Sequence, residues 1–255
     1  MVIGLLHPGE MGSAVGEVLR SAGHTVLWAS EGRSAETVAR AAGFEDAGTT
    51  SELARRSEVI LSVCPPHAAL DVARSVTGFE GVYVDANAVS PATAREVGDA
   101  VAGSFVDGGI IGPPPREPGS TRLYLAGSEA QTVAGLFDGT ALDARVLPGA
   151  PGTASALKMA YAAWTKGTAA MLLAIRELAR AEEVEPALLE EWRLSQPELI
   201  ERSASAARSA ERKGWRWVGE MEEIAAAFAA AGLADGFHRA AAEVFRTLAA
   251  EPQRQ

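Results

Sequence analysis

The sequence is short of cysteine, of positive charge and of long apolar runs. Its only cysteine, Cys64, cannot form an intrachain disulfide, which is typical of a cytosolic protein. Lys and Arg number 23 against 33 Asp and Glu, and the formal net charge of −10 repels nucleic acid and anionic lipid on average. No run approaches the ~20 apolar residues of a membrane span, and the first residues lack a signal-peptide pattern. We therefore expect a cytoplasmic protein with neither a nucleic-acid nor a membrane partner.

The composition is that of a folded chain. Hydrophobic residues make up 47% and charged residues 22% of the 255 positions, which excludes an intrinsically disordered protein. Folded domains cluster at roughly 100–200 residues, so this length predicts two domains.

Residues 1–152 alternate short β-branched runs with alanine-rich stretches, as in βαβ units on a parallel sheet. The expected strands are Val2–Leu6, Thr25–Ala29, Val59–Val63, Gly81–Asp85, Ser104–Asp107, Arg122–Ala126 and Ala144–Leu147. The expected helices are Met11–Ala22, Ser34–Ala42, Ser51–Arg56, Ala68–Val76, Pro91–Val101 and Glu129–Phe137. Nearly all strand residues are apolar, so both faces of the sheet should be covered. The prediction is an α/β fold, a Rossmann-type doubly wound and mostly parallel sheet.

Residues 153–255 lose the strand signals and predict an all-helical C-terminal domain for substrate binding and dimerisation. The expected helices are Thr153–Glu183, Pro186–Leu194, Pro197–Gly214, Val218–Ala231 and Gly236–Ala250, with breaks at Pro186, Pro197, Gly214 and Gly232. About 100 residues with so few large side chains make a thin core. We therefore expect a homodimer formed through this domain.

A glycine-containing turn follows the first strand and predicts a dinucleotide site. Backbone N–H groups and the positive end of the next helix would face a pyrophosphate there. The residues of this predicted site are His7, Pro8, Gly9, Glu10, Met11 and Gly12. His7 stands where a full G-x-G-x-x-G motif has its first glycine, while Gly9 and Gly12 keep the close-approach and packing roles. The alternative is an ordinary tight βα turn.

The end of the second strand predicts which dinucleotide binds. Arg33, with the hydroxyls of Ser30 and Ser34, suits the 2′-phosphate of NADP(H), whereas Glu31 favours the ribose of NAD(H). We predict NADP(H), with NAD(H) as the alternative. In a purely structural interpretation Arg33 is a solvated loop residue and Ser34 caps the next helix.

Five segments, taken in order, resemble the β-hydroxyacid dehydrogenase family. These are Gly4–Gly12 with Ala22–Val26, Ser62–Pro66, Asp85–Pro91, Asp107–Gly112, and Gly149–Gly152 followed by Lys158. That family includes 6-phosphogluconate and 3-hydroxyisobutyrate dehydrogenases, with imine reductases as close relatives. The resemblance implies a nicotinamide-side loop at Val63, Cys64 and Pro65, and a substrate and cofactor segment at Asn87. It also implies a substrate loop at Asp107, Gly108 and Gly109, and a catalytic lysine at Lys158.

Three features depart from the family pattern. Asp107 replaces the usual serine before the paired glycines, and Tyr161 and Ala162 replace the usual asparagines one turn after the lysine. The usual hydroxyacid substrates are therefore in doubt. The segment Gly214–Glu223 resembles a smaller C-terminal domain found in a poorly characterised branch of the superfamily.

Three polar residues of the long helix are the candidates for proton transfer and substrate binding. Hydride transfer to a carbonyl or imine also needs a proton, and we assign Lys158 as its donor or acceptor. Tyr161 is a second candidate donor, and Lys166 a ligand for an anionic substrate group, since both lie near the stripe of Lys158. The alternatives are a snorkelling lysine, a core tyrosine and a solvated lysine.

The strand ends supply the remaining candidates. Asn87 would hold the nicotinamide ribose or the substrate, or else close an Asx turn. Gly108 and Gly109 would let substrate approach the backbone. Asp107 would orient Lys158 or recognise a cationic substrate, unless it merely caps a strand end.

Neither cysteine nor histidine predicts other chemistry. Cys64, followed by two prolines, is a wall residue, and the four histidines show no metal-ligand spacing, so we expect no metal. The resemblance to the family also implies that Trp215 and Trp217, with Glu220, close the pocket from a partner subunit; the alternative is that the tryptophans anchor the helical core.

The leading hypothesis is an NADP(H)-dependent oxidoreductase that moves hydride between nicotinamide and a small carbonyl or hydroxyacid-type substrate. The alternatives are an imine reductase and a non-enzymatic dinucleotide-binding module.

Overall fold

The computed structural model describes residues 1–248 and shows two compact units. The first unit spans Met1–Lys158, and the second begins at Met159. The division falls inside the long helix α7 (Thr153–Ala181), whereas the sequence placed it just before that helix.

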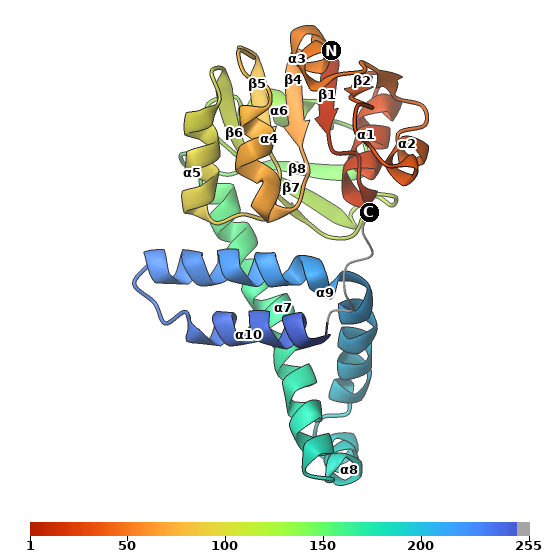
Figure 1. The fold of residues 1–255 in the computed structure, drawn as a ribbon, viewed down its shortest axis with the longest axis vertical. Helices are drawn as coiled ribbons and strands as arrows, with labels where there is room; N and C mark the ends of the chain where they lie inside the picture. The colour runs from red at the N-terminus through yellow and green to blue at the C-terminus, as the bar shows by residue number, and fades with distance from the viewer. Residues whose placement is uncertain (249–255) are drawn as a thin grey trace. The chain divides into compact units, whose positions relative to one another are not determined.

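The first unit is built on one eight-stranded sheet of order β3-β2-β1-β4-β5-β6-β7-β8 (Figure 1). Every neighbouring pair is parallel except β6 with β7. The strands are β1 Val2–Leu6, β2 Thr25–Trp28, β3 Glu45–Asp46, β4 Val59–Ser62, β5 Val82–Asp85, β6 Ser104–Ile111, β7 Thr121–Ala126 and β8 Leu142–Val146. The predicted Rossmann-type, mostly parallel sheet is confirmed.

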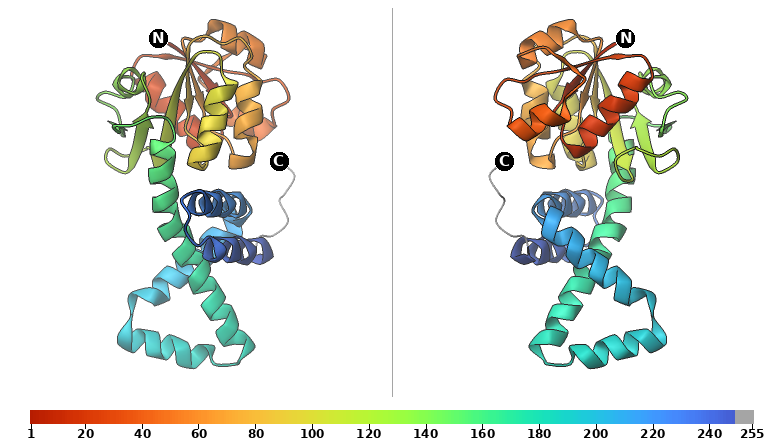
Figure 2. Two further views of the ribbon diagram at one scale, coloured as in Figure 1. Left: turned by 90° about the vertical axis from the view of Figure 1, so that its left-hand side faces the viewer. Right: turned by 90° about the vertical axis from the view of Figure 1, so that its right-hand side faces the viewer.

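Helices cover both faces of this sheet, as the views in Figure 2 show. They are α1 Glu10–Ser21, α2 Ala35–Arg40, α3 Thr50–Arg56, η1 Pro66–Ala68, α4 Ala69–Arg74, α5 Pro91–Ala100 and α6 Ala130–Gly135. One hydrophobic cluster joins alternate strand residues such as Ile3 and Leu5 to α1 and α6. The other joins the intervening residues, such as Leu6 and Ile60, to α3, α4 and α5. This alternation follows from the two-residue period of a strand, in which successive side chains point to opposite faces of the sheet.

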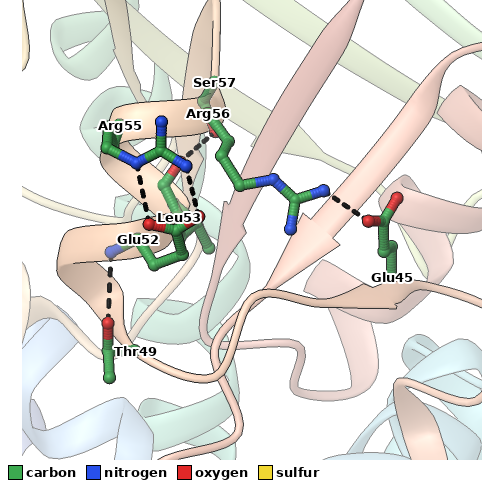
Figure 3. Close-up of polar contacts among 7 residues, drawn as sticks. All are labelled: Glu45, Thr49, Glu52, Leu53, Arg55, Arg56 and Ser57. Carbon is green, nitrogen blue, oxygen red and sulfur yellow. Dashed lines mark hydrogen bonds and ion pairs between the residues drawn. The ribbon is translucent and has the colours of Figure 1, made fainter.

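Strand β3 was not predicted, because its two residues are charged and carry no apolar pattern. The side chain of Arg56 in α3 pairs with Glu45 of β3, and β3 lies beside β2 (Figure 3). Helix α3 begins where Thr49 accepts a hydrogen bond from the N–H of Glu52 at 3.1 Å. The edge strand is therefore anchored by side-chain contacts as well as by its ladder.

The second unit contains the rest of α7 together with α8 Glu185–Ser195, α9 Glu198–Ala230 and α10 Gly236–Leu248. The predicted break at Gly214 is wrong, since α9 runs through it without interruption. A glycine inside a helix costs about 1 kcal/mol relative to alanine, and burial of Ala210, Met221 and Ile224 along the same helix outweighs that cost. The predicted end of the last helix at Ala250 lies outside the described residues. Within residues 1–248, no helix has both the length and the hydropathy that crossing a membrane requires.

Candidate functional site

The strand order reverses between β1 and β4, and ligands of open α/β sheets bind at the carboxyl ends of strands at such a point. The turn after β1 and the start of α1 hold His7 to Gly12, the loop after β4 holds Val63 to Pro65, and Asn87 follows β5. The fold therefore gathers the predicted cofactor residues at one edge of the first unit.

The turn after β1 has a side chain where the motif expects a glycine, and its backbone is nonetheless left-handed. His7 has φ of 63°, and its carbonyl accepts a hydrogen bond from Gly9 N–H at 2.7 Å. A Cβ on Gly12 would lie 2.8 Å from that carbonyl oxygen, so the turn requires glycine there. Pro8 is buried, Met11 packs against the core, and Glu10 begins α1 on the exposed side.

The His7 side chain contacts Arg33 from the loop after β2. Arg33 Nη1 lies 2.8 Å from His7 Nδ1, and burial followed by the charge of Arg33 lowers the pKa of His7 to about 4. The imidazole is therefore neutral at pH 7, and its Nδ1 accepts a hydrogen bond from Arg33 Nη1. Within the described residues, the buried Nε of Arg33 has no hydrogen-bond partner. A cation with an unfilled donor thus lies at the ligand edge of the sheet and suits an anionic ligand.

The two serines predicted alongside Arg33 have other partners. Ser34 accepts a hydrogen bond from Thr37 N–H at 3.3 Å and is the N-cap of α2, as its structural interpretation held. The Ser30 hydroxyl hydrogen-bonds to Asp46 and lowers the pKa of that carboxyl. Arg33 is therefore the member of this trio that reaches the turn after β1.

A row of buried polar residues crosses the ends of three neighbouring strands. Ser62 of β4 is in register with Asp85 of β5, which is in register with Asp107 of β6. All three are at most 2% exposed. This row was not recognised from the sequence, although each residue is polar at or near the end of an apolar run.

Asn87 uses its amide inside the protein. Its Oδ1 accepts from Cys64 N–H at 2.5 Å, and its Nδ2 donates to Ser62 Oγ at 3.2 Å and to Asp85. The side chain is 3% exposed and ties the loop after β4 to the end of β5. These hydrogen bonds position the Val63–Pro65 loop, and the direct contact of Asn87 with ribose or substrate stays a prediction.

Cys64 lies in that loop, and burial raises its pKa to about 12. The thiol is therefore protonated at neutral pH, which fits a wall residue and not a nucleophile.

Asp107 caps the N-terminus of helix α7. Its Oδ2 accepts from the N–H groups of Gly152 at 2.8 Å, Ala154 at 2.7 Å and Ser155 at 3.1 Å. Its Oδ1 accepts from Ser155 Oγ at 2.6 Å. Both oxygens are used and the residue is fully buried, which favours the capping alternative, while recognition of a cationic substrate by Asp107 stays an untested prediction.

The paired glycines allow close packing of the chain on itself. A Cβ on Gly108 would lie 2.9 Å from the Asp85 carbonyl oxygen, and one on Gly109 would lie 2.9 Å from that of Ala154. The close contacts with Asp85 and Ala154 explain why both positions are glycine, and their contact with substrate stays a prediction.

Lys158 lies in the second turn of α7 and bends back to the sheet. Its Nζ donates to the Ile110 carbonyl oxygen of β6 at 2.7 Å, and the side chain is half-buried. The cap at Asp107 and the tight contact at Gly109 fix the helix that carries it. A lysine ammonium is thus held at a defined place beside the carboxyl ends of the strands.

The other α7 candidates belong to the second unit. Tyr161 is 45% exposed. Lys166 Nζ lies 2.6 Å from Glu220 Oε2, with side-chain exposures of 14% and 7%. The ammonium assigned to an anionic substrate group is thus paired with Glu220, and its contact with a substrate stays a prediction. Trp217 packs on Phe245 with ring centroids 5.0 Å apart, as a core anchor does, while Trp215 is 37% exposed.

Within residues 1–248, no three His, Cys, Asp or Glu side chains gather in a way that could hold a metal ion.

Comparisons with known proteins match both units. The family described as NADP oxidoreductase, coenzyme F420-dependent, matches residues 2–89, and a domain of unknown function, DUF1932, matches residues 179–248. An uncharacterised 28.5 kDa protein of Methanothermus fervidus is 30% identical over 183 residues, 70% of this chain and 71% of that protein.

Solved structures match nearly the full length of the chain. A conserved protein of unknown function, described as structurally similar to 3-hydroxyacid dehydrogenases, is 28% identical with a TM-score of 0.71, over 97% of this chain and 96% of that one. The 3-hydroxyisobutyrate dehydrogenase of Salmonella typhimurium has a TM-score of 0.71 at 15% identity, over 97% and 93% of the two chains, and shares the fold. With the ordered motifs and the nucleotide-binding topology, these matches show that the chain belongs to the β-hydroxyacid dehydrogenase superfamily of NAD(P)-dependent oxidoreductases.

Proposed function

We propose that the protein is an NADP(H)-dependent oxidoreductase of small carbonyl or hydroxyacid-type substrates, with Lys158 as proton donor and acceptor. The observation that carries the proposal is the ammonium of Lys158, held 2.7 Å from Ile110 O in the unit that also carries the nucleotide-type turn. Membership of the superfamily supports the same reaction class.

The residues of the first unit fit a dinucleotide phosphate. Gly12 leaves no Cβ between the turn and α1, and Gly9, the N-cap of α1, brings no side chain over the helix end. The positive end of α1 would then receive the pyrophosphate. The buried, unpartnered Nε of Arg33 is a donor that a 2′-phosphate would satisfy, which favours NADP(H) over NAD(H).

The bound nicotinamide supplies the hydride, and the protein supplies position and a proton. The Val63–Pro65 loop, braced by Asn87, would form the wall on the nicotinamide side. Lys158 would give its proton to the oxygen of the reduced carbonyl, or take it back in the oxidative direction. Tyr161 is the second candidate for this proton transfer.

Reduction of an imine is the runner-up, and it has lost part of its support. Asp107 suggested recognition of a cationic nitrogen, but that carboxylate is occupied by the N-terminus of α7. Tyr161 remains its support. A dinucleotide-binding protein without turnover is the other alternative.

The test is calorimetric titration with NADPH and NADH, followed by assays of carbonyls and imines with the wild type and with Lys158→Ala. We expect tighter binding of NADPH. We also expect a loss of turnover of about 10²- to 10⁴-fold in the variant with cofactor affinity intact, because general acid catalysis contributes that much. Full turnover in Lys158→Ala would remove the assignment of the lysine, and binding of neither cofactor would remove the oxidoreductase.

A homodimer through the helical unit is part of the proposal. The side chains of Trp164, Met171, Ile175 and Leu178 recur at helical spacing along α7 and are 63%, 46%, 37% and 64% exposed. Such an exposed apolar row favours burial against a second copy. Light scattering of the wild type and of Leu178→Glu tests the homodimer. We expect the wild type to be a dimer and the variant to dimerise more weakly. A monomeric wild type would contradict the proposal.

A further inference from the structure

The first-glycine position of the turn carries a side chain despite its left-handed backbone. Residues other than glycine rarely adopt a positive φ such as the 63° of His7, since their Cβ crowds the backbone. Residues held in such a conformation cluster at functional sites. The His7 side chain makes a polar contact with Arg33, with 2.8 Å between Nδ1 and Nη1.

We propose that His7 is a positioning residue for cofactor selection: its imidazole holds the Arg33 guanidinium in the orientation that receives the 2′-phosphate of NADP(H). This inference rests on the proposed function and deepens it. His7 would not itself distinguish the two cofactors; it would act through Arg33.

The contact leaves the guanidinium available to an anion. His7 is a neutral acceptor, so it orients Arg33 without neutralising its charge. Arg33 Nε stays buried and without a partner within residues 1–248. The nearby Cys64 thiol is protonated, and the carboxylate of Asp46 accepts from Gly48 N–H at 2.7 Å. The positive charge of Arg33 is therefore retained at the ligand edge.

The free arginine side chain has several rotamers, and ordering them on binding weakens affinity. A guanidinium held in place before the ligand arrives avoids that loss. Because NAD(H) lacks the 2′-phosphate, the benefit should apply to NADP(H) alone. The expected signature is a change in the ratio of the two affinities and not a uniform loss.

The experiment uses calorimetric titration of the full chain with NADPH, NADH and 2′,5′-ADP at one salt concentration. His7→Gly suits the backbone and removes the acceptor. His7→Asn tolerates the left-handed region and places an oxygen on Cγ, where the imidazole has Nδ1. Arg33→Ala removes the group that His7 is proposed to orient, and thermal unfolding of each variant checks its folding.

We expect Arg33→Ala to lose about tenfold or more in affinity for NADPH and 2′,5′-ADP, because it deletes a hydrogen bond to a charged group. His7→Gly should lose roughly five- to tenfold for the same two ligands and little for NADH, from the cost of ordering one long side chain. His7→Asn should retain the preference, and adding His7→Gly to Arg33→Ala should cost nothing further.

Three results would overturn the inference about His7 while leaving the oxidoreductase intact: an unchanged preference in His7→Gly, an equal loss for NADPH and NADH, or additive losses in the double variant. His7→Asp is a second probe with the shape of His7→Asn; its charge should neutralise Arg33 and abolish the preference, and a retained preference would also contradict the inference. If the wild type binds neither dinucleotide, the proposed function itself fails.

Discussion

Asp107 shows how one buried carboxylate organises the start of helix α7. It receives four hydrogen bonds from the first turn of α7, three from N–H groups and one from a hydroxyl. Helix ends otherwise leave such N–H groups unsatisfied, and a negative charge there also interacts with the helix dipole.

Replacing Asp107 should therefore destabilise the protein. We expect Asp107→Asn to lower the free energy of unfolding by about 2–4 kcal/mol. The side chain loses its negative charge, and the NH₂ group of the amide cannot accept hydrogen bonds from the N–H groups of the helix. Ser155→Ala, which removes one of the four bonds, should cost about 1 kcal/mol. Urea unfolding measures both. An unchanged stability with an altered KM for amines would return Asp107 to substrate recognition.

The buried His7 makes the free energy of unfolding depend on pH. Its pKa falls from 6.5 to about 4 on folding, so the unfolded chain binds a proton that the folded chain excludes. Both states are neutral at His7 above pH 6.5, and the penalty grows as the pH falls toward 4, reaching at most about 3 kcal/mol.

The corresponding measurement compares the wild type with His7→Gly by chemical unfolding at several pH values. The difference in stability between the two should shift in favour of the variant between pH 6.5 and 4. A difference that stays constant over this interval would show that His7 is accessible to protons in the folded protein.

Strand β6 and helix α7 pack so closely that only glycine fits between them. A Cβ on Gly109 would meet Ala154 O at 2.9 Å and Lys158 Cβ at 3.1 Å. We expect Gly109→Ala to destabilise the protein by about 1–3 kcal/mol, as overpacking does, and to lower turnover by displacing Lys158.

Gly219 in α9 is the matched control, since a Cβ there meets nothing within 4 Å. Gly219→Ala should stabilise the helix by up to about 1 kcal/mol. Calorimetric melting distinguishes the two substitutions by the sign of the shift in Tm. A neutral Gly109→Ala would mean that α7 moves away from the sheet at little cost.

The ion pair between Lys166 of α7 and Glu220 of α9 joins two long helices of the second unit. Glu220→Gln leaves a buried ammonium and should cost about 3–5 kcal/mol. The double replacement of both residues by Met should be far less costly, because no charge then remains buried. Thermal unfolding tests this, and equal losses in the two variants would assign the effect to packing.

The elements that the sequence predicted are those with a strong local pattern. Strands β1, β4 and β5 are apolar runs bounded by polar residues, and their ends mark the site because parallel strands finish at one edge. The predicted strand at Ser104 ended too early at Asp107, since Gly108 and Gly109 were assigned to a loop, yet both pair with β7. The partners of Asp107 and Asn87 lie 45 and 23 residues away, and no local pattern reveals such pairings.

For the molecule as a whole, two compact units predict separable responses to a ligand. The turn after β1, Arg33 and Lys158 all belong to the first unit. NADPH at about 100 times its Kd should therefore add about 2.7 kcal/mol to the stability of that unit. Differential scanning calorimetry with and without NADPH measures this, and a shift confined to the melting of the second unit would place the cofactor elsewhere.

The cap at Asp107 also bears on how the chain folds during synthesis. The carboxylate leaves the ribosome 45 residues before the first N–H group that it will bind. Every strand of the sheet precedes α7 in the sequence. The first turns of this helix are therefore the last part of the first unit to be synthesised. Since domains generally fold as units and the N-terminal one first, the nucleotide-binding half can be completed while most of the helical half is still untranslated.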